Sequence, residues 1–320
     1  MLIPLPGPLD LDATLDSGQA FRWNRRGDGF EGVVGNSVVS LKTAGDGLEF
    51  SSAPEPEAAV RQRLIEYLAL DIDLENVYRV IRTDEEIGAS IDAFRGMRVL
   101  RQDPWECLAS FICSSNSNIG RIRRNIEDIS VLCGEPIKAD GVEPIRAARH
   151  AFPTPERLAS VGPGPLRDLK LGYRAKYLHE TAVMVAEGRV APLALRETDY
   201  EEALDQLTRL PGVGDKVANC VALFSLEKPE AFPVDVWIHR VLEETYPSEI
   251  RAFRRSLLRR SGPNRPTAGK RKDGAIVARD RLREWAQERF GRYAGWANHY
   301  LFHSRRNQGR AAAKASRSRA

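Results

Sequence analysis

The stretch LPGVGDKVANC (residues 210–220) places a glycine-rich turn directly before a helical pattern, with Lys216 close to the start of that helix. The N-terminal end of a helix carries partial positive charge, so a cation is mildly unfavourable there. Lys216 therefore either contacts something negative or is driven towards its neutral amine. Backbone N–H groups of such a turn can form an anion site suited to a phosphate. A plain turn between two helices is the alternative.

A second candidate lies downstream in EKPEAFPVDVW (residues 227–237). Two prolines precede Asp235 and an apolar helical pattern follows it, so Asp235 is expected to be an N-cap. The connection is long enough to fold back and bring Lys216 and Asp235 to one cavity. Taken singly, an exposed lysine and a capping aspartate would explain both residues equally well.

Composition is that of a globular chain, with 42% hydrophobic and 29% charged residues in 320, enough for two or three domains. We find no long apolar run and no basic leader before an apolar core, and expect an intracellular protein without a membrane partner. The four cysteines fit no zinc spacing and are expected to be free thiols.

Charge is unevenly distributed along the chain. Residues 1–95 hold nine Lys and Arg against 17 Asp and Glu, so the remainder carries the positive excess of this +4 chain. The basic part is the candidate nucleic-acid footprint, although a solvated basic surface would look the same.

Short β-branched runs separated by Gly, Asn and Asp predict an antiparallel sheet in FEGVVGN (30–36), SVVSLKT (37–43) and LEFSS (48–52). A helix is expected over 55–71, and from about Asp84 one helical pattern follows another. The predicted fold class is α+β, with an N-terminal antiparallel β domain (1–95) packed on a mainly helical domain (96–302).

Two basic stretches stand apart from these domains. Residues 251–273, within an insertion at about 251–280, hold nine basic residues and one acid, and the tail 303–320 holds six and none. Both are expected to be mobile. A solubilising role and a phosphate-contacting arm are both open.

LPGVGDKVANC followed by FPVDVW resembles the helix-hairpin-helix DNA glycosylase superfamily. Members with lysine at this hairpin position are bifunctional glycosylase/AP lyases, and members without it use the aspartate alone. Some branches carry four cysteines for an iron–sulfur cluster after this region. No cysteine follows Cys220 here, which excludes that cluster.

The resemblance narrows to the 8-oxoguanine DNA glycosylase family, because further segments occur in that family's order. They are SGQAFRW (17–23), LRQDPWECLASFICSSNSNIGRI (100–122), LGYRAKY (171–177) and YAGWANHYLF (293–302). The similarity spans about residues 9 to 302. It implies that the partner is double-stranded DNA containing 8-oxoguanine opposite cytosine, bound by a monomer without a cofactor or a required metal.

A glycosylase must extrude its target nucleotide and hold the abandoned partner base. The resemblance implies that Arg121 and Arg174 read the orphaned cytosine, whose N3 and O2 accept hydrogen bonds. It also implies that Asn116 fills the vacated space and that Tyr173 wedges into the stack. A polar helix cap and a half-buried aromatic are the structural alternatives.

For the damaged base, the resemblance implies that Gly18 and Gln19 contact 8-oxoguanine. The carbonyl of Gly18 would accept the N7–H found in 8-oxoguanine but absent from guanine. Cys220 and Phe302 would sandwich the base, with core packing as the alternative. Asn298 stands where relatives usually have glutamine for the Watson–Crick edge. Trp237, two residues after Asp235, stands where relatives have a histidine that contacts a DNA phosphate.

The same resemblance assigns Lys216 as the amine that attacks C1′ of the deoxyribose and Asp235 as the carboxylate that stabilises positive charge on the sugar. The positive helix end and partial burial both favour the neutral amine. The backbone around Gly212, Val213 and Gly214 would hold a DNA phosphate.

Three functions follow from these observations. The first is an 8-oxoguanine DNA glycosylase with AP lyase activity. The second is a glycosylase for another damaged purine, which the change at Asn298 keeps open. The third is a non-catalytic helix-hairpin-helix DNA-binding protein, against which the joint presence of Lys216 and Asp235 argues.

Overall fold

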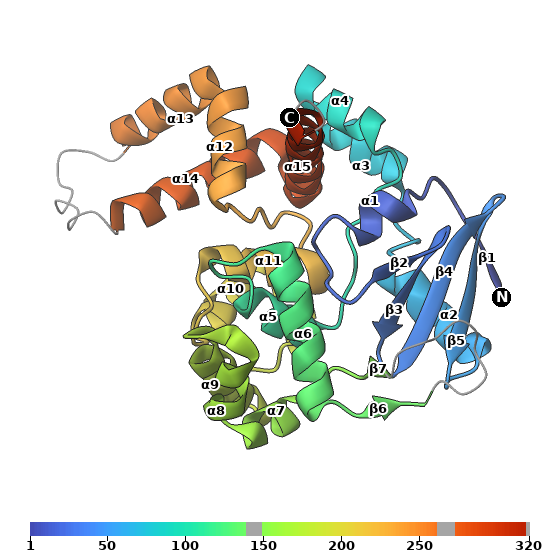
Figure 1. Cartoon of the computed structure of the whole chain (residues 1–320). Helices are drawn as coiled ribbons and strands as arrows, with labels where there is room; N and C mark the ends of the chain where they lie inside the picture. The colour runs from blue at the N-terminus through green and yellow to red at the C-terminus, as the bar shows by residue number, and fades with distance from the viewer. Residues whose placement is uncertain (139–148, 261–272, 318–320) are drawn as a thin grey trace. The chain divides into compact units, whose positions relative to one another are not determined.

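The computed structural model describes residues 1–138, 149–260 and 273–317, with side chains described for 1–138, 149–256 and 281–310. The chain forms two units (Figure 1). Unit 1 consists of Met1–Leu74 and Gly96–Glu227, and unit 2 consists of Glu75–Arg95 and Lys228–Ala320. Each unit is therefore built from two chain segments, one on each side of the domain boundary expected near residue 95.

Unit 1 opens with a five-stranded antiparallel sheet in the order β1-β5-β4-β3-β2. Its strands are β1 (Leu2–Pro4), β2 (Asn24–Arg26), β3 (Gly29–Val34), β4 (Ser37–Ala44) and β5 (Gly47–Ala53). The three runs expected to be strands form β3, β4 and β5, so the predicted sheet is confirmed. The register pairs Phe30 with Leu41 and Leu41 with Phe50, which puts these large apolar side chains on one face of the sheet.

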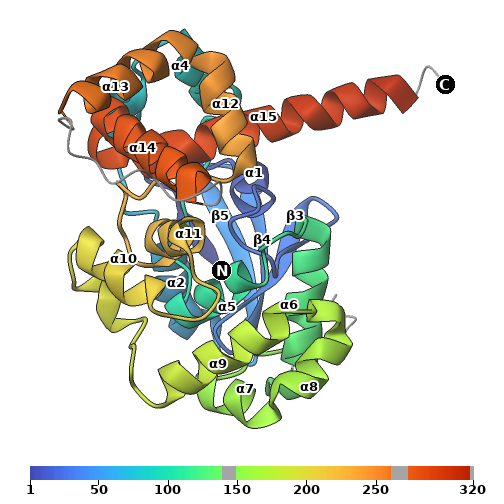
Figure 2. The ribbon, with the colours of Figure 1, turned by 90° about the vertical axis from the view of Figure 1, so that its left-hand side faces the viewer.

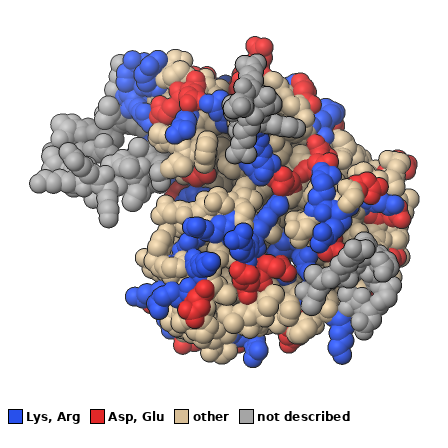
Figure 3. Space-filling model, in the orientation of Figure 1, with Lys and Arg blue, Asp and Glu red and all other residues tan. Residues whose placement is uncertain are grey.

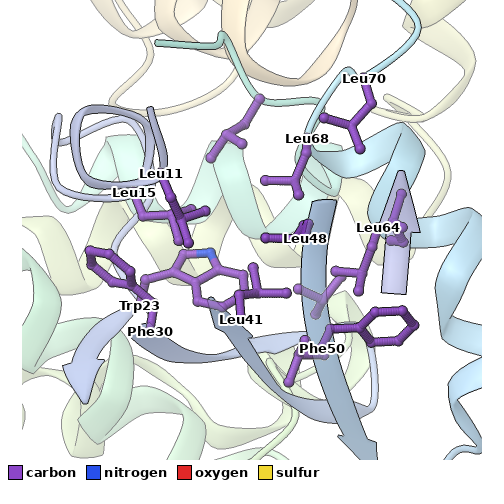
Figure 4. Packing of buried hydrophobic residues seen from close by; sticks show 14 of the residues in the cluster. Leu11, Leu15, Trp23, Phe30, Leu41, Leu48, Phe50, Leu64, Leu68 and Leu70 are labelled. Atoms are coloured by element: carbon purple, nitrogen blue, oxygen red, sulfur yellow. The ribbon is translucent and has the colours of Figure 1, made fainter. Parts of the chain in front are cut away.

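Trp23 is the centre of the core on that face (Figure 4). Its ring crosses β3 at Gly32, where a Cβ atom would lie 2.5 Å from ring atoms, so only glycine fits there. The indole N–H donates to the hydroxyl of Tyr67 at 2.8 Å. Leu15 and Ala20 belong to the same core, so the loop between them is anchored to the sheet.

The rest of unit 1 is mainly helical, as predicted. Its helices and short strands are α1 (Leu11–Leu15), α2 (Glu57–Tyr67), α5 (Pro104–Ile112), α6 (Ile119–Cys133), β6 (Pro136–Ile137), β7 (Arg149–His150), α7 (Pro155–Val161), α8 (Pro163–Leu166), a π-helical turn (Arg167–Leu171), α9 (Arg174–Ala186), a 3₁₀ turn (Ala194–Arg196), α10 (Tyr200–Thr208) and α11 (Asp215–Ser225). Figures 1 and 2 both place α7, α8 and α9 side by side, and α5 packs against α11.

Unit 2 contains α4 (Glu85–Ala93), α12 (Val236–Thr245), α13 (Pro247–Arg260), α14 (Asp273–Phe290), a 3₁₀ turn (Gly291–Tyr293) and α15 (Ala294–Arg317), with α3 (Leu74–Ile81) beginning at the end of unit 1. Within this unit α15 packs against α4 and α12. The far end of α15 projects beyond its neighbours in Figure 2. No helix in the described part of the chain is both long and apolar enough to cross a membrane.

The two basic stretches that were expected to be mobile are helical over much of their length. Residues 251–260 belong to α13, and α15 continues through residues 303–317. The tail contains Ala311, Ala312 and Ala313, which have the highest helix propensity, so the helix continues where charge and low hydropathy indicated disorder. Residues 261–272 and 318–320 lie outside the described residues.

A buried charge cluster lies beside the sheet in unit 1. Arg149 pairs with Glu31 of β3 and Glu127 of α6, both at 3.4 Å, and Arg22 pairs with Glu127 at 3.5 Å. Burial raises the pKa of Glu106 to about 7, against the opposing effect of Arg22. The cluster therefore contains a carboxyl group that folding makes a weaker acid.

Replacing Glu106 with Gln removes the carboxyl group whose pKa is raised and keeps the shape of the side chain. In the unfolded chain Glu106 ionises near pH 4.5, but in the folded chain it keeps its proton until about pH 7, so the wild type loses stability across that interval. We expect Glu106→Gln to raise the free energy of unfolding by about 1–3 kcal/mol at pH 8. Near pH 4 we expect little change. Urea unfolding at both pH values measures this difference, and an equal effect at both would contradict the assignment.

Candidate DNA-binding and catalytic site

The hairpin between α10 and α11 is a tight turn held against α9. Gly212 has φ = +79°, and a Cβ atom there would lie 2.8 Å from Cβ of Tyr177. The carbonyl of Pro211 accepts a hydrogen bond from the hydroxyl of Thr181 at 3.0 Å. Gly214 is the N-cap of α11. The turn therefore requires glycine at 212 for both its backbone angle and its packing.

Lys216 is the second residue of α11 and is half-buried. Its Nζ donates to Oγ of Ser114 at 3.2 Å and lies 4.9 Å from the centre of the Phe111 ring. The hydroxyl of Ser114 in turn donates to the carbonyl of Phe111 at 2.7 Å. The amine thus has a defined position over the C-terminal end of α5. Ser114 and Phe111 were missed as site residues, because only the fold brings them to Lys216.

The loop between α5 and α6 joins the hairpin to α9. Asn116 has a left-handed φ of +50° and donates through Nδ2 to the hydroxyl of Tyr173 at 3.0 Å. That hydroxyl donates to the carbonyl of Ser115 at 3.4 Å. Tyr173 is 51% exposed, and its ring meets that of Tyr177 edge-on at 6.0 Å. The two residues expected to fill a gap in DNA therefore touch each other on the surface that carries Lys216.

The two arginines expected to read the partner base have different environments. Arg174 is buried, and it donates through Nε to the carbonyl of Leu171 at 3.0 Å and through Nη1 to that of Cys113 at 2.9 Å. Arg121 is exposed in the first turn of α6, where its backbone N–H donates to the capping Asn118. Arg174 therefore fixes the loop after α5, while Arg121 presents its guanidinium to solvent.

Basic side chains gather around these elements. Figure 3 shows Lys and Arg concentrated on the face of unit 1 that carries α6 and the α10–α11 turn. Arg121 and Arg124 of α6 are both exposed there. A face of this kind attracts a polyanion.

The segment expected to contact the damaged base contains Gly18 and Gln19. Gly18 is half-buried with φ = +94°. Gln19 is buried, and its side-chain amide donates to the carbonyls of Thr14 and Arg98 and accepts from the N–H of Leu100. The Gln19 side chain therefore fastens the chain beside Gly18 rather than projecting towards a ligand.

Cys220 lies one turn beyond Lys216 on α11 and is 3% exposed. It is a free thiol, as are the other three cysteines, so the prediction of free thiols is confirmed. Phe224 lies one turn further along the same helix, and its ring stacks on that of Phe111 with ring centres 5.6 Å apart.

Unit 2 carries the remaining predicted site residues. Asp235 is the N-cap of α12, as predicted, and its Oδ1 accepts hydrogen bonds from the N–H groups of Trp237 at 2.9 Å and Ile238 at 2.8 Å. Asn298 is buried and donates through Nδ2 to the carbonyl of Pro233 at 2.9 Å, two residues before Asp235. Phe302 is half-buried one turn further along α15.

The predicted catalytic pair is divided between the units, with Lys216 on α11 of unit 1 and Asp235 on α12 of unit 2. Unit 1 brings together Lys216, the hairpin, Asn116 and Tyr173, and unit 2 brings Asn298 to the segment before Asp235. Within the described side chains, no group of three His, Cys, Asp or Glu residues could hold a metal ion.

Comparison with known proteins agrees with this architecture. Residues 109–256 match the HhH-GPD superfamily of base excision DNA repair proteins, which is the class that the hairpin and its lysine define. Residues 2–108 match the N-terminal domain of 8-oxoguanine DNA glycosylase. The chain belongs to the 8-oxoguanine DNA glycosylase family.

Three relatives illustrate the similarity. The N-glycosylase/DNA lyase OGG1 of Arabidopsis thaliana is 33% identical over 92% of this chain and 76% of its own. The N-glycosylase/DNA lyase of Saccharomyces cerevisiae is 32% identical over 92% and 82%. The 8-oxoguanine glycosylase/lyase of Clostridium acetobutylicum, solved with DNA containing cytosine opposite 8-oxoguanine, has a TM-score of 0.78 at 28% identity over 94% and 93%.

Substituting Gly212 tests the hairpin. An alanine would have to adopt a left-handed φ and would press its Cβ against Tyr177, so we expect Gly212→Ala to cost about 1–3 kcal/mol of folding stability and to weaken duplex binding. Gly7→Ala is the control, because Gly7 lies outside the hairpin, has no positive φ, and a Cβ there would meet nothing within 4 Å. Urea unfolding and DNA titration of both variants measure the difference. Equal losses would show that the turn does not depend on Gly212.

Proposed function

We propose that this chain excises 8-oxoguanine paired with cytosine from duplex DNA and then nicks the strand as an AP lyase. The observation that carries the proposal is the position of the Lys216 amine, half-buried at the start of the hairpin helix and fixed by Ser114. A surface lysine without a role at the site would have no need of a hydrogen bond to a hydroxyl and a position over an aromatic ring. We propose that the enzyme acts as a monomer on chromosomal DNA, in a nucleoid or a nucleus.

The surface around Lys216 suits the extrusion of a nucleotide. Removing a base from the stack costs a few kcal/mol and leaves a gap. Asn116 and Tyr173, joined by a hydrogen bond, would occupy that gap. Arg121 and the remaining donor nitrogen of Arg174 would bind the orphaned cytosine. The backbone of Gly212, Val213 and Gly214 would hold a phosphate of the same duplex.

The chemistry begins with the neutral amine of Lys216 adding to C1′ of the deoxyribose. The bond from C1′ to N9 breaks, and its electron pair leaves with the base, which takes up a proton. The bond from C1′ to O4′ then breaks as the amine passes one of its protons to O4′, which opens the sugar ring and gives a protonated Schiff base. Loss of a proton from C2′ then expels the 3′ phosphate by β-elimination. The carboxylate of Asp235 would stabilise the positive charge that develops on the sugar.

The residues proposed to recognise the damaged base are Gly18, Cys220, Phe302 and Asn298. The Gly18 carbonyl would accept the N7–H of 8-oxoguanine, while Cys220 and Phe302 would contact its faces. Such a contact is worth about 1–3 kcal/mol, hence roughly ten- to a hundredfold discrimination against guanine. Asn298 would bind the Watson–Crick edge with a side chain one methylene shorter than glutamine.

The shorter Asn298 keeps a second function open, namely excision of another damaged purine. Excision rates on a panel of duplexes with different lesions and opposite bases separate the two. We expect 8-oxoguanine opposite cytosine to be the preferred substrate. If the protein binds the duplexes but releases no base from any lesion, the result would instead support a non-catalytic DNA-binding function.

The covalent step can be trapped with borohydride. We expect wild-type protein and an 8-oxoguanine duplex to give a covalent complex, and Lys216→Gln to abolish it and to slow base release by at least about 100-fold. Lys42→Gln is the control, since Lys42 is an exposed lysine paired with Glu49 on the sheet. Gel electrophoresis after reduction measures the trapped complex, and its absence with wild-type protein would remove the lyase proposal.

Asp235→Asn separates charge from capping. Asparagine caps helices as well as aspartate does, so the hydrogen bonds to the start of α12 should persist. We expect single-turnover base excision to fall by about 10²–10³-fold with lesion binding nearly unchanged. A large loss of affinity together with lower thermal stability would make Asp235 a structural residue instead.

A further inference from the structure

The start of α12 exposes two apolar side chains to solvent, Val236 at 60% and Trp237 at 57%. The other tryptophans of the chain lie inside the protein: Trp23, Trp285 and Trp296 are at most 5% exposed and Trp105 is half-buried. An indole ring has a large apolar face and usually lies in a core or an interface. The exposure of Trp237 therefore calls for a binding partner.

Arg240 holds the exposed ring from one side. Its guanidinium carbon lies 5.6 Å from the centre of the Trp237 ring, and both side chains are exposed. The pair combines an aromatic ring with a cation. Proteins bind single nucleic-acid strands chiefly through these two kinds of group, with aromatic rings against the bases and cations against the phosphates.

The position of the pair relative to Asp235 is fixed. The N–H of Trp237 donates to Oδ1 of Asp235 at 2.9 Å, so the backbone that carries the ring is tied to the carboxylate. Two residues span at most about 7.2 Å of backbone, whereas successive nucleotides of a strand are about 3.4 Å apart along the helix axis. A ring so close to Asp235 reaches the nucleotide beside the one that Asp235 serves.

We propose that Trp237 and Arg240 form a binding site for the DNA strand next to the damaged nucleotide. The indole packs against the neighbouring base or deoxyribose, and the Arg240 guanidinium pairs with a phosphate of the same strand. This inference rests on the proposed function, because that function places Asp235 at the sugar of the extruded nucleotide. Every base has a π face, so the site holds the strand without reading its sequence.

Tryptophan fluorescence of the Lys216→Gln variant, which leaves the DNA intact, tests the site directly. Adding an 8-oxoguanine:cytosine duplex should quench the emission, and the quenching should be lost when Trp237→Phe is combined with Lys216→Gln. The dissociation constant should rise by about 5- to 100-fold for Trp237→Ala and much less for Trp237→Phe. Arg240→Gln should lower the slope of log affinity against log salt by about one.

Leu193→Ala is the matched control, because Leu193 is an equally exposed apolar residue, at 63%, outside the proposed site. Its affinity should equal that of the parent, and thermal unfolding should be unchanged for it and for Trp237→Ala. Duplex binding that leaves the Trp237 emission unchanged, with Trp237→Ala within about twofold of the parent, would overturn the inference. Excision by the wild type in that case would leave the proposed function intact. A wild type that binds and quenches but excises nothing would remove the proposed function instead.

Discussion

Segments that carry predicted site residues of unit 1 are positioned around the ring of Phe111. Phe21 meets it edge-on and Phe224 stacks on it, each with ring centres 5.6 Å apart, so three chain segments converge on one side chain. The Lys216 amine lies over the same ring and donates to Ser114, three residues further on. A hydroxyl accepts a hydrogen bond from either protonation state of an amine, so this contact fixes the nitrogen without adding a charge. Because protein interiors are close-packed, the segments cannot shift independently.

The two groups proposed to carry out the chemistry are held in place in different ways. On unit 1 the amine of Lys216 is positioned by side chains, whereas on unit 2 the carboxylate of Asp235 is positioned by backbone. Only Oδ1 of Asp235 receives the capping hydrogen bonds from Trp237 and Ile238, so capping orients the group through one carboxylate oxygen. Asn298 secures the chain just before Asp235 from α15. The cap is therefore compatible with the catalytic role proposed for Asp235.

Local features of the sequence were sufficient to predict much of this structure. Short β-branched runs separated by Gly, Asn and Asp predicted β3, β4 and β5, and two prolines followed by an apolar helical pattern predicted the capping role of Asp235. Contacts between distant segments were not predictable: Ser114 and Lys216 are 102 positions apart, and nothing local signals their hydrogen bond. The buried amide of Gln19 was likewise assigned to a ligand, since its backbone partners come together only on folding. The helix over 303–317 was missed because charge outweighed the propensity of its alanines.

In the proposed mechanism one particular nitrogen, Nζ of Lys216, bonds to C1′ of the damaged nucleotide. Proteolysis of the borohydride-reduced complex followed by mass spectrometry of the cross-linked peptide locates that nitrogen directly. We expect the added mass on Lys216, in the peptide that begins after Arg209. Added mass on another lysine or on the amino group of Met1, with Lys216 unmodified, would contradict it.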